Sequence, residues 1–181
     1  MKMFRYVLCF VFLALGSFCF GSDTERYINS NYCFTVPRLH LASETLSQDG
    51  AGITFSKVNG CAEAPVGSCE KVSVYAQYAV GNERSPTNWF EDLDSVYVQS
   101  GWNLDRRGVK QANGVKWRVS TFSKTEAGRR VSVETYQTAS SKSKPAIIYA
   151  IDAVFPAEDK ANMYAYIGQL TREFERTDPC R

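Results

Sequence analysis

The sequence predicts a single α+β domain: an antiparallel sheet of about six to seven strands, two packed helices and stabilising disulfides. Several segments alternate apolar and polar residues with the period of two that is typical of half-buried strands. Two other segments repeat apolar residues every three or four positions, which is the spacing of an amphipathic helix. The predicted order is three strands, a helix, four strands and a second helix, which favours an α+β domain.

Residues 1–21 are predicted to be a cleaved signal peptide, and residues 22–181 form the single domain. A positively charged start is followed by an apolar run over residues 6–15 and by small residues before a plausible cleavage site at Ser22. The apolar run is shorter than the roughly 20 residues that a membrane-spanning helix needs. The sequence therefore predicts a secreted or periplasmic protein without a membrane span, in an oxidising compartment.

Four cysteines remain after this cleavage, and they allow three pairings. Cys61 and Cys69 enclose a short loop of turn-forming residues, so we expect them to pair. Cys33 and Cys180 would then pair by elimination and join the two ends of the domain. Zinc is the alternative, but no two cysteines have the close spacing of a zinc site and His40 is the only histidine. No metal or cofactor is expected.

Three short strands are predicted before the first helix. They cover residues 32–36, 52–58 and 71–80, and the third alternates clearly between its two faces. Residues 22–30 are polar and are predicted to be a loose lead-in. Residues 38–48 show no clear period, so no element is assigned to them.

The first helix is predicted to start at Ser85 and Pro86, an N-cap followed by proline at the first helical position. Gly101 ends it. An apolar stripe on this helix is expected to pack in the core; it consists of Trp89, Phe90, Leu93, Val96 and Tyr97.

Four strands and a helix follow, at 103–111, 115–122, 129–138, 147–155 and 157–176. The dipeptide Asn113-Gly114 is typical of a tight hairpin between the first two of these strands. The last strand is apolar on both faces, so we expect it to lie centrally and to be covered on both sides.

The predicted core joins the sheet to both helices. On the strands it comprises Trp117, Val119, Val131, Val133, Ile147, Tyr149 and Ile151, and on the helices Trp89, Phe90, Leu93, Ile167 and Phe174. In the strand 115–122, the alternate residues Lys116, Arg118 and Ser120 are expected to point outward.

The domain opens with Tyr32-Cys33-Phe34-Thr35-Val36-Pro37, and Asp49-Gly50 later leads into Ile53-Thr54-Phe55. These strings resemble the opening of secreted bacterial relatives of the Mog1/PsbP-like fold, and the strand and helix over 147–174 resemble its ending. The resemblance implies an α+β fold. Disulfides are not a general feature of proteins with this fold. Proteins of this fold have unrelated roles, such as GTPase binding, photosystem assembly and effector neutralisation, so the resemblance implies little about function.

Basic residues are concentrated in one part of the chain. Residues 106–144 contain ten Lys or Arg against only Glu126 and Glu134, whereas residues 22–105 contain five basic and eleven acidic residues. Such segregation steers acidic partners toward the basic region. Nucleic acid is a weaker interpretation, because the mature chain is close to neutral overall.

Within this stretch we predict a binding face formed by Arg118, Arg130, Lys116 and Arg129. Lys116 and Arg118 share one face of their strand, and Arg130 is expected to lie close to them on the neighbouring strand. Arginine is the preferred anchor because its guanidinium binds carboxylates in a bidentate manner. A solvated sheet face without a binding role is the alternative.

Two hypotheses about function follow. The first is a non-enzymatic secreted or periplasmic module that binds an acidic protein in the envelope or outside the cell, such as an inhibitor or immunity protein that neutralises a toxin or hydrolase. The second is a small-ligand-binding protein or enzyme with a pocket around Asp152, because a carboxylate in so apolar a strand must be paired or protonated. A pocket at Asp152 favours the second hypothesis, and a flat basic face favours the first.

Overall fold

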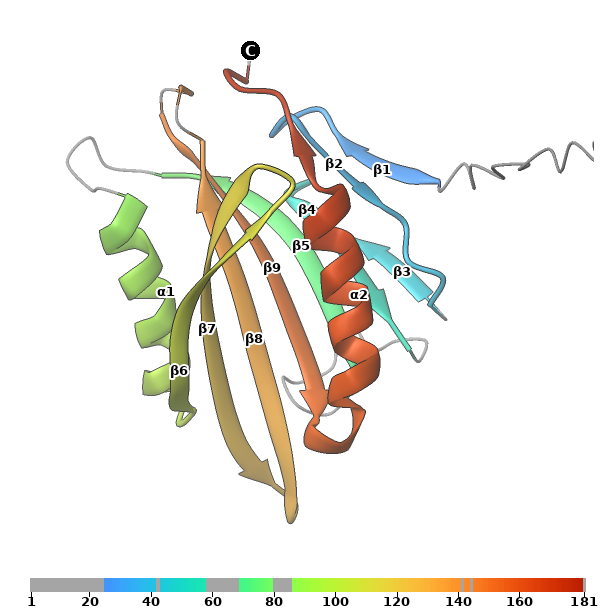
Figure 1. Ribbon diagram of the computed structural model, residues 1–181, viewed down its shortest axis with the longest axis vertical. Helices are drawn as coiled ribbons and strands as arrows, with labels where there is room; N and C mark the ends of the chain where they lie inside the picture. Colours follow the sequence, from blue (N-terminus) through green and yellow to red (C-terminus); the bar gives the residue numbers. More distant parts are fainter. Residues whose placement is uncertain are drawn as a thin grey trace, which may run out of the picture.

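The computed structural model describes residues 25–41, 43–57, 69–79, 86–140, 142–143 and 145–180. The described residues form two antiparallel sheets and two α-helices, which confirms the α+β class (Figure 1). The larger sheet has seven strands in the order β3 (Ser43–Leu46), β4 (Gly52–Ser56), β5 (Lys71–Tyr78), β9 (Ile147–Pro156), β8 (Arg129–Ala139), β7 (Val115–Glu126) and β6 (Asn103–Ala112). The smaller sheet consists of β1 (Arg26–Asn29), β2 (Phe34–Pro37) and β10 (Glu175–Arg176).

The two helices cover opposite faces of the seven-stranded sheet. Helix α2 (Lys160–Glu173) crosses in front of the sheet in Figure 1, and α1 (Pro86–Gln99) packs on the other side. We call these sides the α2 face and the α1 face. Strand β9 is fourth of the seven and is covered on both sides, as its apolar sequence predicts.

The core is divided between these two faces. The larger cluster lies on the α2 face, where Trp117, Tyr149 and Ile151 pack with Ile167 and Phe174. A smaller cluster lies on the α1 face and contains Trp102, Phe122, Val131, Val133 and Val154. The predicted core strands therefore do face helices, but Trp117 and Val133 contribute to different clusters.

Helix α1 differs most from expectation. Trp89, Phe90 and Leu93 are only half-buried, and the one fully buried residue of the helix is Asp94. The prediction that Arg118 and Ser120 point outward is wrong, because α1 covers their side of the sheet: Ser120 is buried and Arg118 is largely so.

Three short strands were not predicted from the sequence. Part of the expected lead-in forms β1, part of the unassigned segment forms β3, and Glu175–Arg176 leaves the predicted helix to pair with β2. The second helix begins only at Lys160, after a 3₁₀ turn over Ala157–Asp159. The predicted cap at Ser85 and the signal peptide lie outside the described residues.

Two predicted chain reversals are confirmed. Asn113 and Gly114 have φ values of 48° and 70°, the positive pair required by a type I′ hairpin between β6 and β7. Gly101, two residues after the end of α1 at Gln99, has a φ of 82°, a left-handed conformation that glycine adopts without steric cost.

The predicted disulfide between Cys33 and Cys180 is confirmed, with the two Cα atoms 5.5 Å apart. Cys69 is also disulfide-bonded, and its predicted partner Cys61 lies outside the described residues. Neither helix in the described part of the chain is long and apolar enough to cross a membrane.

Candidate functional site

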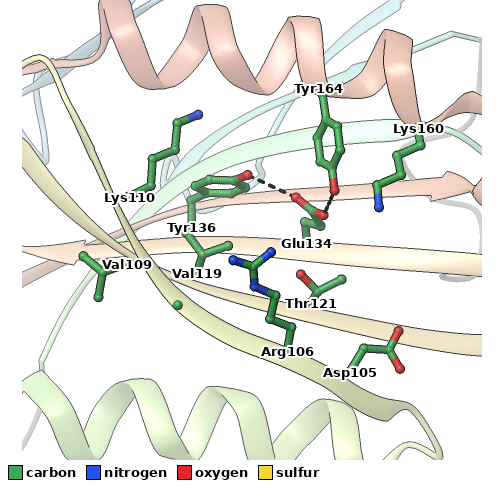
Figure 2. A pocket seen from close by; sticks show the side chains of 11 residues that line it. Asp105, Arg106, Val109, Lys110, Val119, Thr121, Glu134, Tyr136, Lys160 and Tyr164 are labelled. Atoms are coloured by element: carbon green, nitrogen blue, oxygen red, sulfur yellow. Dashed lines mark hydrogen bonds between the residues drawn. The ribbon is translucent and has the colours of Figure 1, made fainter.

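Each face of the large sheet carries a pocket with a carboxylate at its centre. On the α2 face, a cavity of about 400 Å³ lies between α2 and strands β6 to β8 (Figure 2). We call it the Glu134 pocket; it is lined by Asp105, Arg106, Gly108, Val109, Lys110, Val119, Thr121, Glu134, Tyr136, Lys160 and Tyr164. The tip of the β6–β7 hairpin closes one end of it, because the Asn113 side-chain amide donates to the Phe174 carbonyl at 3.0 Å.

Glu134 is held in this pocket by two tyrosines. Its side chain is buried, and the Tyr136 hydroxyl donates to Oε2 at 3.0 Å while the Tyr164 hydroxyl donates to Oε1 (Figure 2). Burial, together with the Glu134 charge, raises the pKa of both tyrosine hydroxyls. The two hydroxyls therefore stay protonated, and both carboxylate oxygens are occupied by fixed donors.

Three cationic side chains surround this carboxylate (Figure 2). Lys110 lies over the Tyr136 ring at 5.3 Å, and burial lowers the pKa of its ammonium group. Lys160 lies over the Tyr164 ring at 5.2 Å. Arg106 makes no hydrogen bond or ion pair with the described part of the chain, and its charge counteracts the rise in pKa of both tyrosines.

The charge of the pocket is therefore positive. Arg106, Lys110 and Lys160 outnumber Asp105 and Glu134 in the lining, and Asp105 already forms an ion pair with Arg130, at 3.1 Å. A concave site with excess positive charge and aromatic walls favours a ligand group with negative charge.

The second pocket lies on the α1 face around Asp152 and has a volume of about 390 Å³. The hydroxyls of Tyr75 and Tyr97 donate to Asp152 Oδ2 at 2.7 and 3.3 Å. Oδ1 is buried and has no hydrogen-bond partner in the described structure. Burial raises the pKa of Asp152 to about 6, outweighing the two tyrosine hydrogen bonds that lower it. The pocket anticipated around Asp152 is thus present.

The four predicted cations do not form one face. Arg118 lies opposite Gln137, whereas Arg130 lies opposite Thr125, seven residues further along β7. The β7–β8 turn places Arg129 and Arg130 at the far end of the sheet from Lys116, and Arg118 and Arg130 lie on opposite faces. The expected proximity of Arg130 to Arg118 is therefore wrong, while a binding role for each residue stays a prediction.

Two of these four cations have acidic partners at the surface, and a third has a buried one. Arg129 pairs with the exposed Glu158, and Arg130 with Asp105. Arg118 donates to Asp94 Oδ2 at 2.7 Å and lies over the Phe90 ring. Its guanidinium is therefore part of the packing of α1 on the sheet.

Asp94 is the acceptor at the centre of that packing. Its Oδ2 accepts hydrogen bonds from Arg118 Nη2, from Arg107 Nε at 2.9 Å and from Ser120 Oγ at 3.1 Å. The sequence alone shows Asp94 only as one of several acidic residues in the predicted helix. Only the burial of the α1 face reveals its role, which is to satisfy cations on β6 and β7.

Replacing Asp94 by alanine should lower the free energy of unfolding by about 3 kcal/mol, because the largely buried Arg118 loses its counter-ion. Urea unfolding at neutral pH measures the loss. Glu158→Ala is the matched control: it removes an ion pair whose partners are both more than half exposed, and it should cost less than about 1 kcal/mol. Equal losses in the two variants would contradict a structural role for Asp94.

Comparison with known proteins finds relatives in structure only. No family model matches the chain, and no curated protein matches it in sequence. A crystal structure from Bacteroides thetaiotaomicron aligns with a TM-score of 0.57 and 10% identity over 87% of this chain. This chain spans only 50% of the length of that protein.

Two further structures align over most of both chains. LpqN of Mycobacterium tuberculosis, described as involved in cell envelope biogenesis, has a TM-score of 0.54 and 9% identity and covers 87% of each chain. The cyanobacterial PsbP protein (CyanoP) of Synechocystis has a TM-score of 0.54 and 10% identity over 90% of this chain and 99% of its own. These identities support a shared fold alone. The chain has the PsbP-like α+β fold that its opening and closing segments resemble.

Proposed function

We propose that this chain is a non-enzymatic, extracytoplasmic binding protein that docks an acidic segment of a partner protein along β6, with the Glu134 pocket as anchor. The observation that carries the proposal is the position of Arg106, Lys110 and Lys160 around one cavity beside a sheet edge. This site replaces the face around Arg118 as the place where an acidic partner would bind.

Strand β6 offers a backbone edge for such a segment. It is the last strand of the seven-stranded sheet, and among the described strands it pairs with β7 alone. Its outer row of N–H and C=O groups can accept an added strand, which is a common way of binding extended peptides. Val109 lies next to Lys110 along β6 and is 63% exposed; it pairs with Arg118 and so points to the α1 face, which offers an apolar contact to the other face of an added strand.

The side chains supply the preference for acidic residues. Arg106 can form a bidentate contact with a carboxylate, and Lys110 and Lys160 add positive charge on the same face. Positive residues on an edge strand also prevent edge-to-edge aggregation. Lys160 belongs to α2 and not to the edge, which favours a binding role for the cluster as a whole.

Binding without catalysis is supported by the state of the central carboxylate. Both oxygens of Glu134 accept hydrogen bonds from tyrosines that stay protonated, so Glu134 is poorly placed to accept a proton from a substrate. The disulfide between Cys33 and Cys180 supports an oxidising compartment, and the structural similarity to LpqN supports an envelope location. The inhibitor or immunity role stays a prediction.

The test uses a fluorescent peptide of about ten residues that alternates Glu with Val, matching the side-chain alternation of a strand. A second peptide with Gln in place of Glu is the neutral control. We expect the Glu peptide to bind at least about tenfold more tightly in fluorescence anisotropy, a difference of roughly 1.4 kcal/mol. The preference should weaken with added salt.

Protein variants locate the site. The double variant Arg106→Glu/Lys160→Glu should abolish the preference for the Glu peptide, whereas Lys116→Glu/Arg129→Glu should retain it. Both pairs are exposed enough to leave the thermal melt unchanged. Loss of binding in the second variant alone would place the site at Lys116 or Arg129 instead of the Glu134 pocket. Equal binding of the two peptides by the unmodified protein would contradict the proposal.

A further inference from the structure

The Asp152 pocket is independent of the Glu134 pocket, because the two lie on opposite faces of the sheet. Its floor consists of alternate residues of β4, β5 and β9, including Thr54, Ser73 and Tyr75, and Tyr97 of α1 forms one wall. Helix α1 contacts mainly the β6 side of this face. The floor over β4 and β5 is therefore only half-buried and open to a ligand.

The Asp152 carboxylate is fixed on one side and free on the other. Two tyrosine hydroxyls hold Oδ2, which leaves Oδ1 as a buried acceptor without a donor among the described residues. Thr135 lies directly opposite Asp152 on β8, and its Oγ1 is also buried without a partner in the described part of the chain. The Oε1 atom of Gln137, two residues further along β8, is in the same state.

Of these three oxygens, Asp152 Oδ1 is the one that belongs to a residue lining the pocket. A buried acceptor without a donor is costly, and a group with several N–H donors would relieve that cost. Burial raises the pKa of both nearby tyrosine hydroxyls well above the ordinary value, so both stay protonated, and each uses its one proton to donate to Oδ2.

The charge and the aromatic side chains of the lining favour the same kind of ligand. Asp49 and Asp152 line the pocket against Lys71, so acidic groups outnumber basic ones. Three tyrosines, Tyr32, Tyr75 and Tyr97, also contribute to the lining. Aromatic rings beside a carboxylate are the usual means by which proteins bind organic ammonium groups.

We infer that the Asp152 pocket binds a small organic cation through its ammonium group, with Asp152 Oδ1 as the main acceptor. The volume of about 390 Å³ lies within the range of small-molecule pockets. The two pockets therefore have opposite ligand preferences. The Asp152 pocket on the α1 face favours cations, and the Glu134 pocket on the α2 face favours anions.

The first test compares three probes that differ only at the polar end. Phenethylammonium carries charge and N–H donors, (2-phenylethyl)trimethylammonium carries charge without donors, and 2-phenylethanol has no charge. In calorimetric titrations at pH 7.5, phenethylammonium should bind at least about tenfold more tightly than the alcohol, with the trimethyl compound between them. Equal affinity for the ammonium compound and the alcohol would overturn the inference without the need for any variant.

The second test uses substitutions. Asp152→Asn keeps the shape of the side chain and should remove the preference for the ammonium compound over the alcohol. Glu158→Gln, at an exposed position on the turn before α2, is the control and should leave the preference unchanged. A preference that persists in Asp152→Asn would overturn the assignment of Asp152 as the acceptor.

The third test is pH. The pKa of Asp152 is affected by Tyr75 of β5 and by Tyr97 and Asp94 of α1, and the charged groups Asp49 and Lys71 line the same pocket. Since the pKa of Asp152 is about 6, lowering the pH from 7.5 to 5 should protonate most of this carboxyl and weaken phenethylammonium binding about tenfold. The affinity of the alcohol should not change. An ammonium affinity independent of pH over this range would contradict the inference.

Discussion

Replacing both Cys33 and Cys180 by alanine should lower the free energy of unfolding by about 4 to 5 kcal/mol, the largest single effect expected in this protein. The disulfide joins residues 147 positions apart, so it removes many conformations from the unfolded chain. In the chain-entropy model the stabilisation grows with the length of the closed loop. Urea unfolding of the oxidised proteins, before and after substitution, measures it.

The single substitution Cys33→Ala provides a control for this result. Either cysteine alone leaves the bond unformed, so the single and double variants should unfold at nearly the same urea concentration. A loss below about 1 kcal/mol in both would mean that the unfolded chain is already compact without the bond. A much larger loss in the single variant would instead indicate mispairing of Cys180 with another cysteine.

Replacing Phe174 by alanine should cost about 3 to 5 kcal/mol, because the ring lies at the centre of the larger core cluster. It packs against Trp117 and Tyr149, with ring centroids 5.0 and 5.5 Å away, and stacks on Phe34 at 6.1 Å. The ring thus joins the end of α2 to both sheets. Urea or thermal unfolding of the variant measures the loss.

Two comparisons make this second result specific. Phe174→Leu removes less volume and should cost clearly less than Phe174→Ala. Leu46→Ala, at a position that is 62% exposed on the edge strand β3, should change the free energy of unfolding by no more than about 0.5 kcal/mol. A loss below about 1 kcal/mol for Phe174→Ala would mean that the end of α2 does not pack against the sheet.

The long elements could be predicted because their periods are visible in the sequence. Strands β5 to β9 and both helices follow from alternation, helical spacing and the Asn113-Gly114 turn. Strands β1, β3 and β10 could not, since they have only four, four and two residues, and β10 also forms by pairing with the distant strand β2. Their sequences carry no period long enough to detect.

The candidate sites were predicted less completely, because both sheet faces are covered. Asp152 is conspicuous between apolar neighbours, so its burial could be predicted. Glu134 and Asp94 occur among polar residues that look solvated until α2 and α1 are placed over them. The position of Arg130 depends on the end of the sheet at which the β7–β8 turn lies. The distribution of charges along the sequence does not show this, so the distance between Arg130 and Arg118 could not be predicted.

The order β1-β2-β10 in the small sheet has a consequence for how the domain would bear mechanical load. Both ends of the described chain lie in or beside this sheet, and the bond between Cys33 and Cys180 connects them covalently. A pulling force applied to the two ends would pass through that bond and bypass residues 34–179. Of the described residues, only 25–32, which include β1 and the pocket residue Tyr32, would bear the load, so the large sheet and the Glu134 pocket would keep their shape under tension.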